Sequence, residues 1–395
     1  MKRALVVVLA LVSTSSIACG GSKGKGASNT PETAKKEERH LASSAVQAMV
    51  EGAAFAKIYL KDGDTTGANG KAISKLQAAI ALDGRLWEAR YDLALVYARA
   101  GELAKAEDEL AKASEAAPEA ESVAVALCEV RRRRGETKLA AEGLEAFARA
   151  HPNALDARAR LVVVLREAGR NDEAIAHARF LLARRPLDDA TRAELALAHL
   201  AKGERDVAEL LVAQALKQNP KSAPAWRAQG LIALQKGDDA EAFRAFEKCA
   251  ELDPSDTTAR INMGAVLLRA GAFKEAEAAF RAALANAAND VEAMLGVAVS
   301  LRSQKKLEEA RAAYERVLAA SPHHLAATFD LAVLYADYLK DSGKAKALFK
   351  QVVDDAPKGS PMAKSAEEYI KVLGSDSTPP PKPPTEPKPT PPAKK

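Results

Sequence analysis

Histidine and cysteine are the residue types in this chain that could bind a metal ion or act as nucleophiles, and they are few. The chain has three cysteines and six histidines, and the histidines are His40, His151, His177, His199, His323 and His324. Their spacing matches no metal-binding or catalytic motif, and no glycine-rich phosphate loop follows a strand, because the sequence predicts no strand. We therefore expect no enzyme activity, no catalytic residue, no metal site and no cofactor.

Glycine, alanine and proline instead recur at an interval of 34 residues. The glycines are Gly101, Gly135, Gly169, Gly203, Gly237 and Gly271. The alanines are Ala106, Ala140, Ala174, Ala208, Ala242, Ala276 and Ala310. The prolines are Pro118, Pro152, Pro186, Pro220 and Pro254, followed by Pro322 two periods later. Since three residue types share one period, the chain is a tandem array of one small unit, which favours a binding scaffold over a catalyst.

Each unit is predicted to be two short helices joined by a tight turn. In the copy that begins at Trp87, an apolar helical stripe ends at Gly101, and glycine ends helices because it adopts the left-handed conformation. A second helix follows, with Ala106 against the first helix, where a larger side chain would push the two helices apart. Pro118 then prevents that helix from continuing.

This pattern resembles the tetratricopeptide repeat (TPR). The best copy runs from Ala223 to Pro254, with Trp226, Gly230, Gly237, Ala242 and Phe246 in the family's positions. The resemblance covers about residues 40–357 and implies an all-α, right-handed α-solenoid of about nine units, followed by a capping helix at 358–374. The pattern is irregular at Ala288 in a proline position, at Lys305 in a turn-glycine position, and at one extra residue near Asp341.

Composition agrees with a helical array. Apolar residues make up 48% of the chain and aromatic residues 5%, which suits alanine-rich helix packing. The net charge is +5, from 58 Lys and Arg against 53 Asp and Glu mixed along the helices. This is the charge pattern of a solvated surface, so we expect no nucleic-acid partner.

The N-terminus resembles that of a bacterial lipoprotein. Lys2 and Arg3 precede a short apolar run, and Ile17-Ala18-Cys19-Gly20 resembles the lipobox, although Ser16 stands where leucine is usual. The resemblance implies a signal peptide at 1–18, lipid attachment at Cys19, and a flexible, disordered tether at 19–39 that holds the protein at the outer membrane, facing the periplasm. The alternative is an ordinary signal peptide that is cut nearby, with Cys19 there by chance.

The other two cysteines, Cys128 and Cys249, are expected to be buried small residues. They lie more than three units apart in the array. Units contact only their neighbours, so no disulfide is expected between them.

The C-terminal segment, residues 375–395, is rich in proline and lysine and is expected to be disordered. Dense proline favours an extended polyproline II conformation. The segment is either a solvated spacer or a docking segment for an aromatic-lined groove on a protein or for peptidoglycan.

First helices line the concave face in this repeat family, so their positions predict a partner-binding groove. The expected groove residues are Leu95, Arg132, Arg133, Arg166, Leu197, Leu200, Leu231, Leu234, Leu268, Val299, Arg302 and Val333. From Leu197 to Leu268 this surface is largely aliphatic, which favours an apolar or amphipathic helix or an extended peptide as partner. The arginine run 131–134 either extends its charged heads into solvent or forms a basic patch for an acidic partner.

These features predict a non-catalytic protein–protein interaction scaffold, anchored in the membrane by lipid. The first hypothesis is assembly or stabilisation of an envelope machine, such as a type IV pilus, a secretion channel or a gliding-motility complex. The alternative is a lipoprotein that binds or maintains envelope polysaccharide or peptidoglycan. That alternative would need aromatic platforms on the concave face, where the sequence places mostly aliphatic residues.

Overall fold

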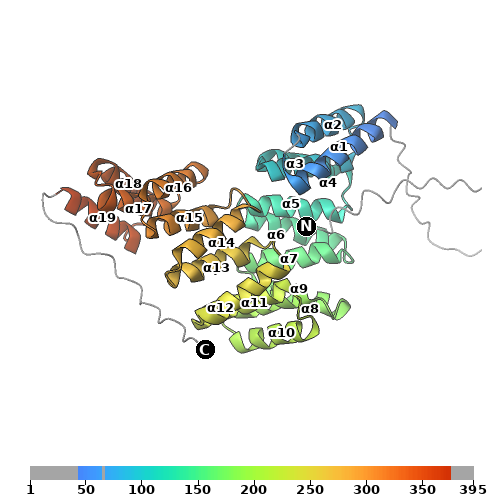
Figure 1. Cartoon of the computed structure of the whole chain (residues 1–395). Helices are drawn as coiled ribbons and strands as arrows, with labels where there is room; N and C mark the ends of the chain where they lie inside the picture. The colour runs from blue at the N-terminus through green and yellow to red at the C-terminus, as the bar shows by residue number, and fades with distance from the viewer. Residues whose placement is uncertain (1–42, 65–66, 375–395) are drawn as a thin grey trace, which may run out of the picture. The chain divides into compact units, whose positions relative to one another are not determined.

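The computed structural model describes residues 43–64 and 67–374, and this part of the chain is entirely helical (Figure 1). It contains nineteen α-helices and one π-helix, with no strand among the described residues. The helices divide into an N-terminal unit that ends at His177 and a C-terminal unit that begins at Ala178. The expected signal peptide, tether and proline-rich segment lie outside the described residues.

The N-terminal unit is built from consecutive helices, and from α1 to α7 each helix packs against the next. Its helices are α1 (Ser43–Asp62), α2 (Ala68–Leu82), α3 (Trp87–Ala100), α4 (Leu103–Ala116), α5 (Glu121–Arg133), α6 (Thr137–Ala150), α7 (Leu155–Glu167) and the start of α8 (Asn171–Arg184). Helix α1 ends at Asp62 and α2 begins at Ala68, so a short loop joins the first two helices.

The C-terminal unit continues the same alternation. After the rest of α8 come α9 (Asp189–Ala201), α10 (Arg205–Gln218), α11 (Ala223–Lys236), α12 (Asp239–Leu252), α13 (Thr257–Arg269), α14 (Phe273–Leu284), α15 (Val291–Ser303), α16 (Leu307–Ala320), α17 (Leu325–Val333), η1 (Leu334–Tyr338), α18 (Ser342–Asp355) and α19 (Pro361–Gly374). Taken in order, α1 to α18 form nine helix–turn–helix repeats, which confirms the predicted fold class.

The 34-residue glycines lie in the turns, as predicted. All six have positive φ, from 74° at Gly169 to 84° at Gly101. Beside Gly101, the N–H of Glu102 donates to the carbonyl of Tyr97 at 2.9 Å, a bond that closes the end of α3. Lys305 occupies the seventh turn with φ of 63°, so the turn keeps its left-handed shape without glycine.

The 34-residue alanines lie between paired helices, and all seven are buried, as predicted. Glycine on a first helix makes room for an aromatic ring in the same way. A Cβ at Gly230 would lie 2.6 Å from Cε1 of Phe246, closer than packed atoms approach. These small residues let each second helix pack closely on the first.

The extra residue near Asp341 is absorbed by the π-helix η1. The N–H of Leu339 donates to the carbonyl of Leu334 at 3.0 Å, a span of five residues instead of four. Lys340 then turns the chain with φ of 58°, and Asp341 caps α18 by accepting from the N–H of Lys344 at 3.0 Å. The widened turn restores the register, so α18 packs on α17 as other second helices do.

Candidate partner-binding surface

The expected groove residues of the N-terminal unit lie on α3, α5 and α7. Leu95 is half-buried against the core of this unit. Arg132 and Arg166 are half-buried, and Arg133 is exposed. The side chains of one leucine and three arginines are therefore at least partly exposed at the predicted groove positions of this unit.

The arginine run at 131–134 is largely paired within the unit. Arg132 donates to Glu129 at 2.8 Å and lies 3.5 Å from Glu167 on α7, and the bond to Glu129 raises the pKa of its guanidinium. The neighbouring pairs join Arg131 to Glu107 at 2.8 Å, Arg134 to Glu107, and Arg134 to Glu136 at 3.0 Å. The run therefore belongs to a mixed ion-pair network, and positive charge is not concentrated there.

The carboxyl group of Asp92 on α3 lies in surroundings that disfavour its charged form. Its Oδ2 is buried and has no hydrogen-bond partner among the described residues. Burial, and then the nearby charge of Glu88, raise the pKa of Asp92 to about 7. This carboxyl therefore exchanges its proton close to neutral pH.

In the C-terminal unit, the leucines predicted on α9 are core residues. Leu197 is 5% exposed and Leu200 is 8% exposed. The expectation that these two residues line an open groove is therefore corrected. Helix α11 packs against α9, and both leucines belong to the apolar cluster that these helices share with α10.

From α11 onward, the predicted apolar positions are half-buried. Each rests with one side on the core and leaves the other side uncovered among the described residues. These positions are Leu231, Leu234, Leu268, Val299 and Val333.

Three further apolar residues, which the sequence analysis did not group together, lie one helical turn earlier in their repeats than Val299 and Val333 do in theirs. Ile261, Leu295 and Phe329 repeat at 34 residues on α13, α15 and α17 and are also half-buried. The same period that revealed the glycines would have revealed them. We call these three residues and the five predicted ones together the apolar stripe.

Ion pairs beside the apolar stripe join successive first helices. Arg302 on α15 lies 2.9 Å from Asp330 on α17, and the hydroxyl of Tyr314 donates to the same carboxylate at 3.4 Å. Arg227 on α11 lies 3.0 Å from Glu194 on α9 and 2.8 Å from Asp256, which caps α13. Because these charges are paired, Arg302 is part of the scaffold rather than a free cation, and the stripe carries little net charge.

The apolar stripe ends in a hollow of about 510 Å³ between α17, α19 and the loop that joins α18 to α19. Its wall includes Leu325, Phe329, Pro357, Pro361, Met362 and Ser365. The ring of Phe329 is edge-on to Phe349 at 5.5 Å and to Tyr369 at 6.1 Å, so its position is fixed by packing. The hollow therefore continues the apolar surface of the stripe beyond Phe329.

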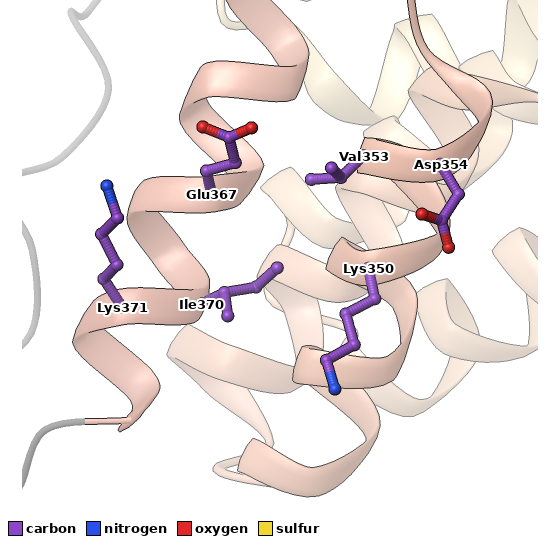
Figure 2. Close-up of a pocket in the computed structure, with 6 residues that line it drawn as sticks. All are labelled: Lys350, Val353, Asp354, Glu367, Ile370 and Lys371. Carbon is purple, nitrogen blue, oxygen red and sulfur yellow. The ribbon is translucent and has the colours of Figure 1, made fainter. Parts of the chain in front are cut away.

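A smaller hollow of about 300 Å³ lies between α18 and α19 (Figure 2). Figure 2 shows Val353 and Ile370 facing the space between the helices, with Lys350 and Asp354 on α18 and Glu367 and Lys371 on α19. Counted from Leu325, the seventh residue is Leu331 in α17 and the eleventh is Tyr335 in η1, and both are buried in the core shared with α18. In α19 the same places hold Glu367 and Lys371, so α19 presents charge where a further helix would pack.

Several cysteine and histidine side chains, which are of types that can react or bind metal, have structural roles in this fold. Burial raises the pKa of the free thiols of Cys128 and Cys249 to about 12, so both stay neutral. His199 is buried beside Glu204, and His324 caps α17. The described residues contain no cluster of three or more His, Cys, Asp or Glu that could hold a metal ion.

Three family models match the chain. Two are described as tetratricopeptide repeat, one over residues 55–121 and 126–189 and the other over 165–232 and 301–367. The third is described as the TPR domain of cytochrome c-type biogenesis protein H and matches residues 200–327. Together they cover residues 55–121 and 126–367.

The chain is a tetratricopeptide repeat protein. No curated protein matches it.

Solved structures share the fold of this tetratricopeptide repeat protein. The human IFIT1 dimer with m7Gppp-AAAA is 14% identical with a TM-score of 0.54, over 82% of this chain and 81% of that chain. PilF of Pseudomonas aeruginosa is 20% identical with a TM-score of 0.47, over 54% and 96%. TTC0263, a thermophilic TPR protein of Thermus thermophilus, is 22% identical with a TM-score of 0.41, over 46% and 99%. At these identities the likeness concerns the fold alone.

Tetratricopeptide repeat proteins are typically non-catalytic scaffolds that bind other proteins on extended surfaces. The tetratricopeptide repeat protein described above is accordingly a protein–protein interaction scaffold. In residues 43–64 and 67–374, no helix combines the length and apolar character needed to span a bilayer.

Proposed function

We propose that this protein is a lipid-anchored scaffold that holds an apolar or amphipathic segment of a partner protein along the apolar stripe. In doing so it would assemble or stabilise an envelope machine such as a type IV pilus, a secretion channel or a gliding-motility complex. The observation that carries the proposal is the stripe itself, with half-buried apolar side chains on each of the helices α11, α13, α15 and α17.

The form of the stripe supports an apolar partner. Contiguous apolar surface on a protein in water favours burial by a partner, and each buried Å² contributes about 25 cal/mol. The flanking charges of Arg227 and Arg302 are already paired with carboxylates. A partner that brings its own charge would have to break these pairs, so an uncharged segment fits better than a terminal carboxylate.

The proposed location rests on the sequence Ile17-Ala18-Cys19-Gly20, which lies outside the described residues. Lipid on Cys19, followed by the polar residues up to 39, would tether the helical array at the outer membrane, facing the periplasm. Each buried methylene of the lipid adds about 0.8 kcal/mol to membrane binding.

One of the matching families supports an assembly role. The model that covers residues 200–327 takes its name from a protein of cytochrome c-type biogenesis, which is an assembly process. Those residues include α11, α13 and α15, which carry most of the stripe. The match favours an assembly factor without naming the machine.

The test is proximity labelling in the native cell with the full chain. Leu234→Asp combined with Val299→Asp places two charges on the stripe. Apolar anchor residues typically contribute about 2 kcal/mol or more each, so labelling of the true partner should fall about tenfold or further. Proteins labelled equally by the wild type and this variant would not be partners of the stripe, and a fully unchanged set would refute the proposal.

Two further variants complete the test. Leu210→Asp is the matched control, because Leu210 is 59% exposed on the second helix α10, away from the stripe. It should leave labelling unchanged. Cys19→Ala tests the lipid anchor independently of the apolar stripe. It should release the protein from the membrane fraction, while the partner still binds to the stripe of the purified protein.

A further inference from the structure

The hollow at the end of the apolar stripe lies where α17 and α19 begin. Leu325 and Pro361, the first residues of the two helices, both line the hollow. Near the other ends of the helices, the hydroxyl of Tyr369 donates to Oδ2 of Asp337 at 3.5 Å. The two helices therefore run side by side in the same direction, with the hollow at their N-terminal ends.

This arrangement determines where the next segment of the chain begins. Helix α19 ends at Gly374, little more than one turn beyond Tyr369. The chain therefore leaves α19 near η1, and the hollow lies at the opposite end of α19. A segment that turned back along α19 would reach the hollow.

The sequence of that segment matches the chemistry of the hollow. Residues 379–392 read Pro-Pro-Pro-Lys-Pro-Pro-Thr-Glu-Pro-Lys-Pro-Thr-Pro-Pro. Such sequences favour polyproline II and dock with their rings on aromatic-lined apolar grooves. The hollow offers the rings of Phe329, Pro357 and Pro361 together with Met362, and a hydroxyl on Ser365. We propose that residues 379–392 of the same chain fold back along α19 and occupy this hollow.

The segment is long enough. The 14 residues of α19 span about 20 Å at ~1.5 Å per residue. Polyproline II advances about 3.1 Å per residue, so roughly seven residues cover that distance and the remaining prolines reach the hollow. Because the segment is tethered to α19, its local concentration at the hollow is in the mM range. A hollow that binds the segment with a Kd of about 1 mM would therefore be half occupied.

Occupancy by the segment would have a consequence for the apolar stripe. Phe329 belongs to both the stripe and the hollow, so the folded-back segment and an external partner would compete at that end. The inference itself does not depend on the existence of a partner, since it concerns contacts within one chain.

The test compares two cysteine pairs in the full chain, with Cys19→Ser to remove a competing thiol. The first pair is Met362→Cys with Thr385→Cys, which joins the hollow to the middle of the proline-rich segment. The matched control is Val353→Cys with Thr385→Cys. Val353 is also half-buried but lies in the smaller hollow, whose wall includes Ile370 and Lys371 near the C-terminal end of α19. Cys128 and Cys249 remain as buried, neutral thiols.

A docked segment should form the Met362 disulfide within one chain at least about tenfold faster than the Val353 disulfide. Exchanging the prolines of 379–392 for serine should abolish this preference, because the polyproline II conformation is lost. Equal rates for the two pairs would overturn the proposal, since an undocked segment meets Val353 at least as readily. A disulfide that forms mainly between two chains would overturn it as well.

Discussion

The ring of Phe280 on α14 lies directly against Gly296 on α15, so that a Cβ at Gly296 would overlap the ring. The tip of the same ring meets Gly264 on α13, where a Cβ would lie 2.8 Å from Cζ. One aromatic side chain thus joins two neighbouring repeats through two glycines. Close approach of this kind makes the repeat interface sensitive to a single methyl group.

Gly296→Ala is therefore expected to lower the free energy of unfolding by about 1–3 kcal/mol, the usual cost of overpacking. Urea denaturation followed by circular dichroism would measure it. Gly343→Ala is the matched control, because a Cβ there meets only Oδ1 of Asp341 at 3.5 Å. Since alanine favours helix over glycine, the control should be neutral or slightly stabilising, and equal losses in both variants would contradict the packing argument.

Lys305→Gly is expected to stabilise the protein by about 0.5–1 kcal/mol. A left-handed backbone costs a residue other than glycine roughly 1–2 kcal/mol, and part of this gain is offset by the greater freedom of glycine in the unfolded chain. Lys306→Gly should give no gain, because its φ of −82° is favourable for lysine. Chemical denaturation of the two variants would separate them, and a gain at Lys306 as large as at Lys305 would count against the explanation.

Asp92 makes stability depend on pH. Its pKa is raised from 3.8 to about 7 in the folded protein, so the fold keeps a proton that the unfolded chain loses. The stability of the wild type should therefore fall as the pH rises from about 4 to about 7. Asp92→Asn should remove this fall and be more stable above pH 7 by about 1–2 kcal/mol, after allowance for partial exposure.

Thermal unfolding at several pH values would test this prediction, with Asp108→Asn as the control because Asp108 is exposed on α4. The stability gain of Asp92→Asn should disappear near pH 4. A gain that is the same at pH 4 and pH 8 would show that proton binding by Asp92 is not its cause.

Arg132→Glu is expected to destabilise the N-terminal unit by about 1–3 kcal/mol, because it places a third carboxylate beside Glu129 and Glu167. Arg133→Glu should change stability by less than about 0.5 kcal/mol, since Arg133 is exposed. If Arg133→Glu instead abolished binding of a labelled partner while the fold stayed intact, the run would act as a basic recognition patch after all.

The repeat architecture could be predicted from the sequence because its signals are local. Glycine in a left-handed turn and alanine between two helices act within a few residues of their own positions, and the structure confirms both. The period also located the turn at Lys305, although it did not show that lysine adopts the left-handed conformation there. The extra residue near Asp341 was recognised too, but its accommodation by a π-helix depends on how α17 and α18 pack.

The surface was harder to predict because burial depends on neighbouring repeats. Leu197 occupies the same place in its repeat as Val299, yet α11 packs so closely on α9 that Leu197 is enclosed. The pairing of Arg132 with Glu167 joins residues on different helices, and no short pattern connects them. Sequence periodicity identifies equivalent positions, but the spacing of adjacent helices decides which of them stay accessible.

Glu367 and Lys371, the charged residues on the outer face of α19, affect how a repeat array of this kind can change in length during evolution. A repeat duplicated between α16 and α17 would meet apolar faces on both sides and could join the stack at once. A repeat added after α19 would have to bury Glu367 and Lys371 against its own helices, which is unfavourable unless both charges are satisfied. New repeats are therefore expected to arise inside the array, with α19 kept as its last helix.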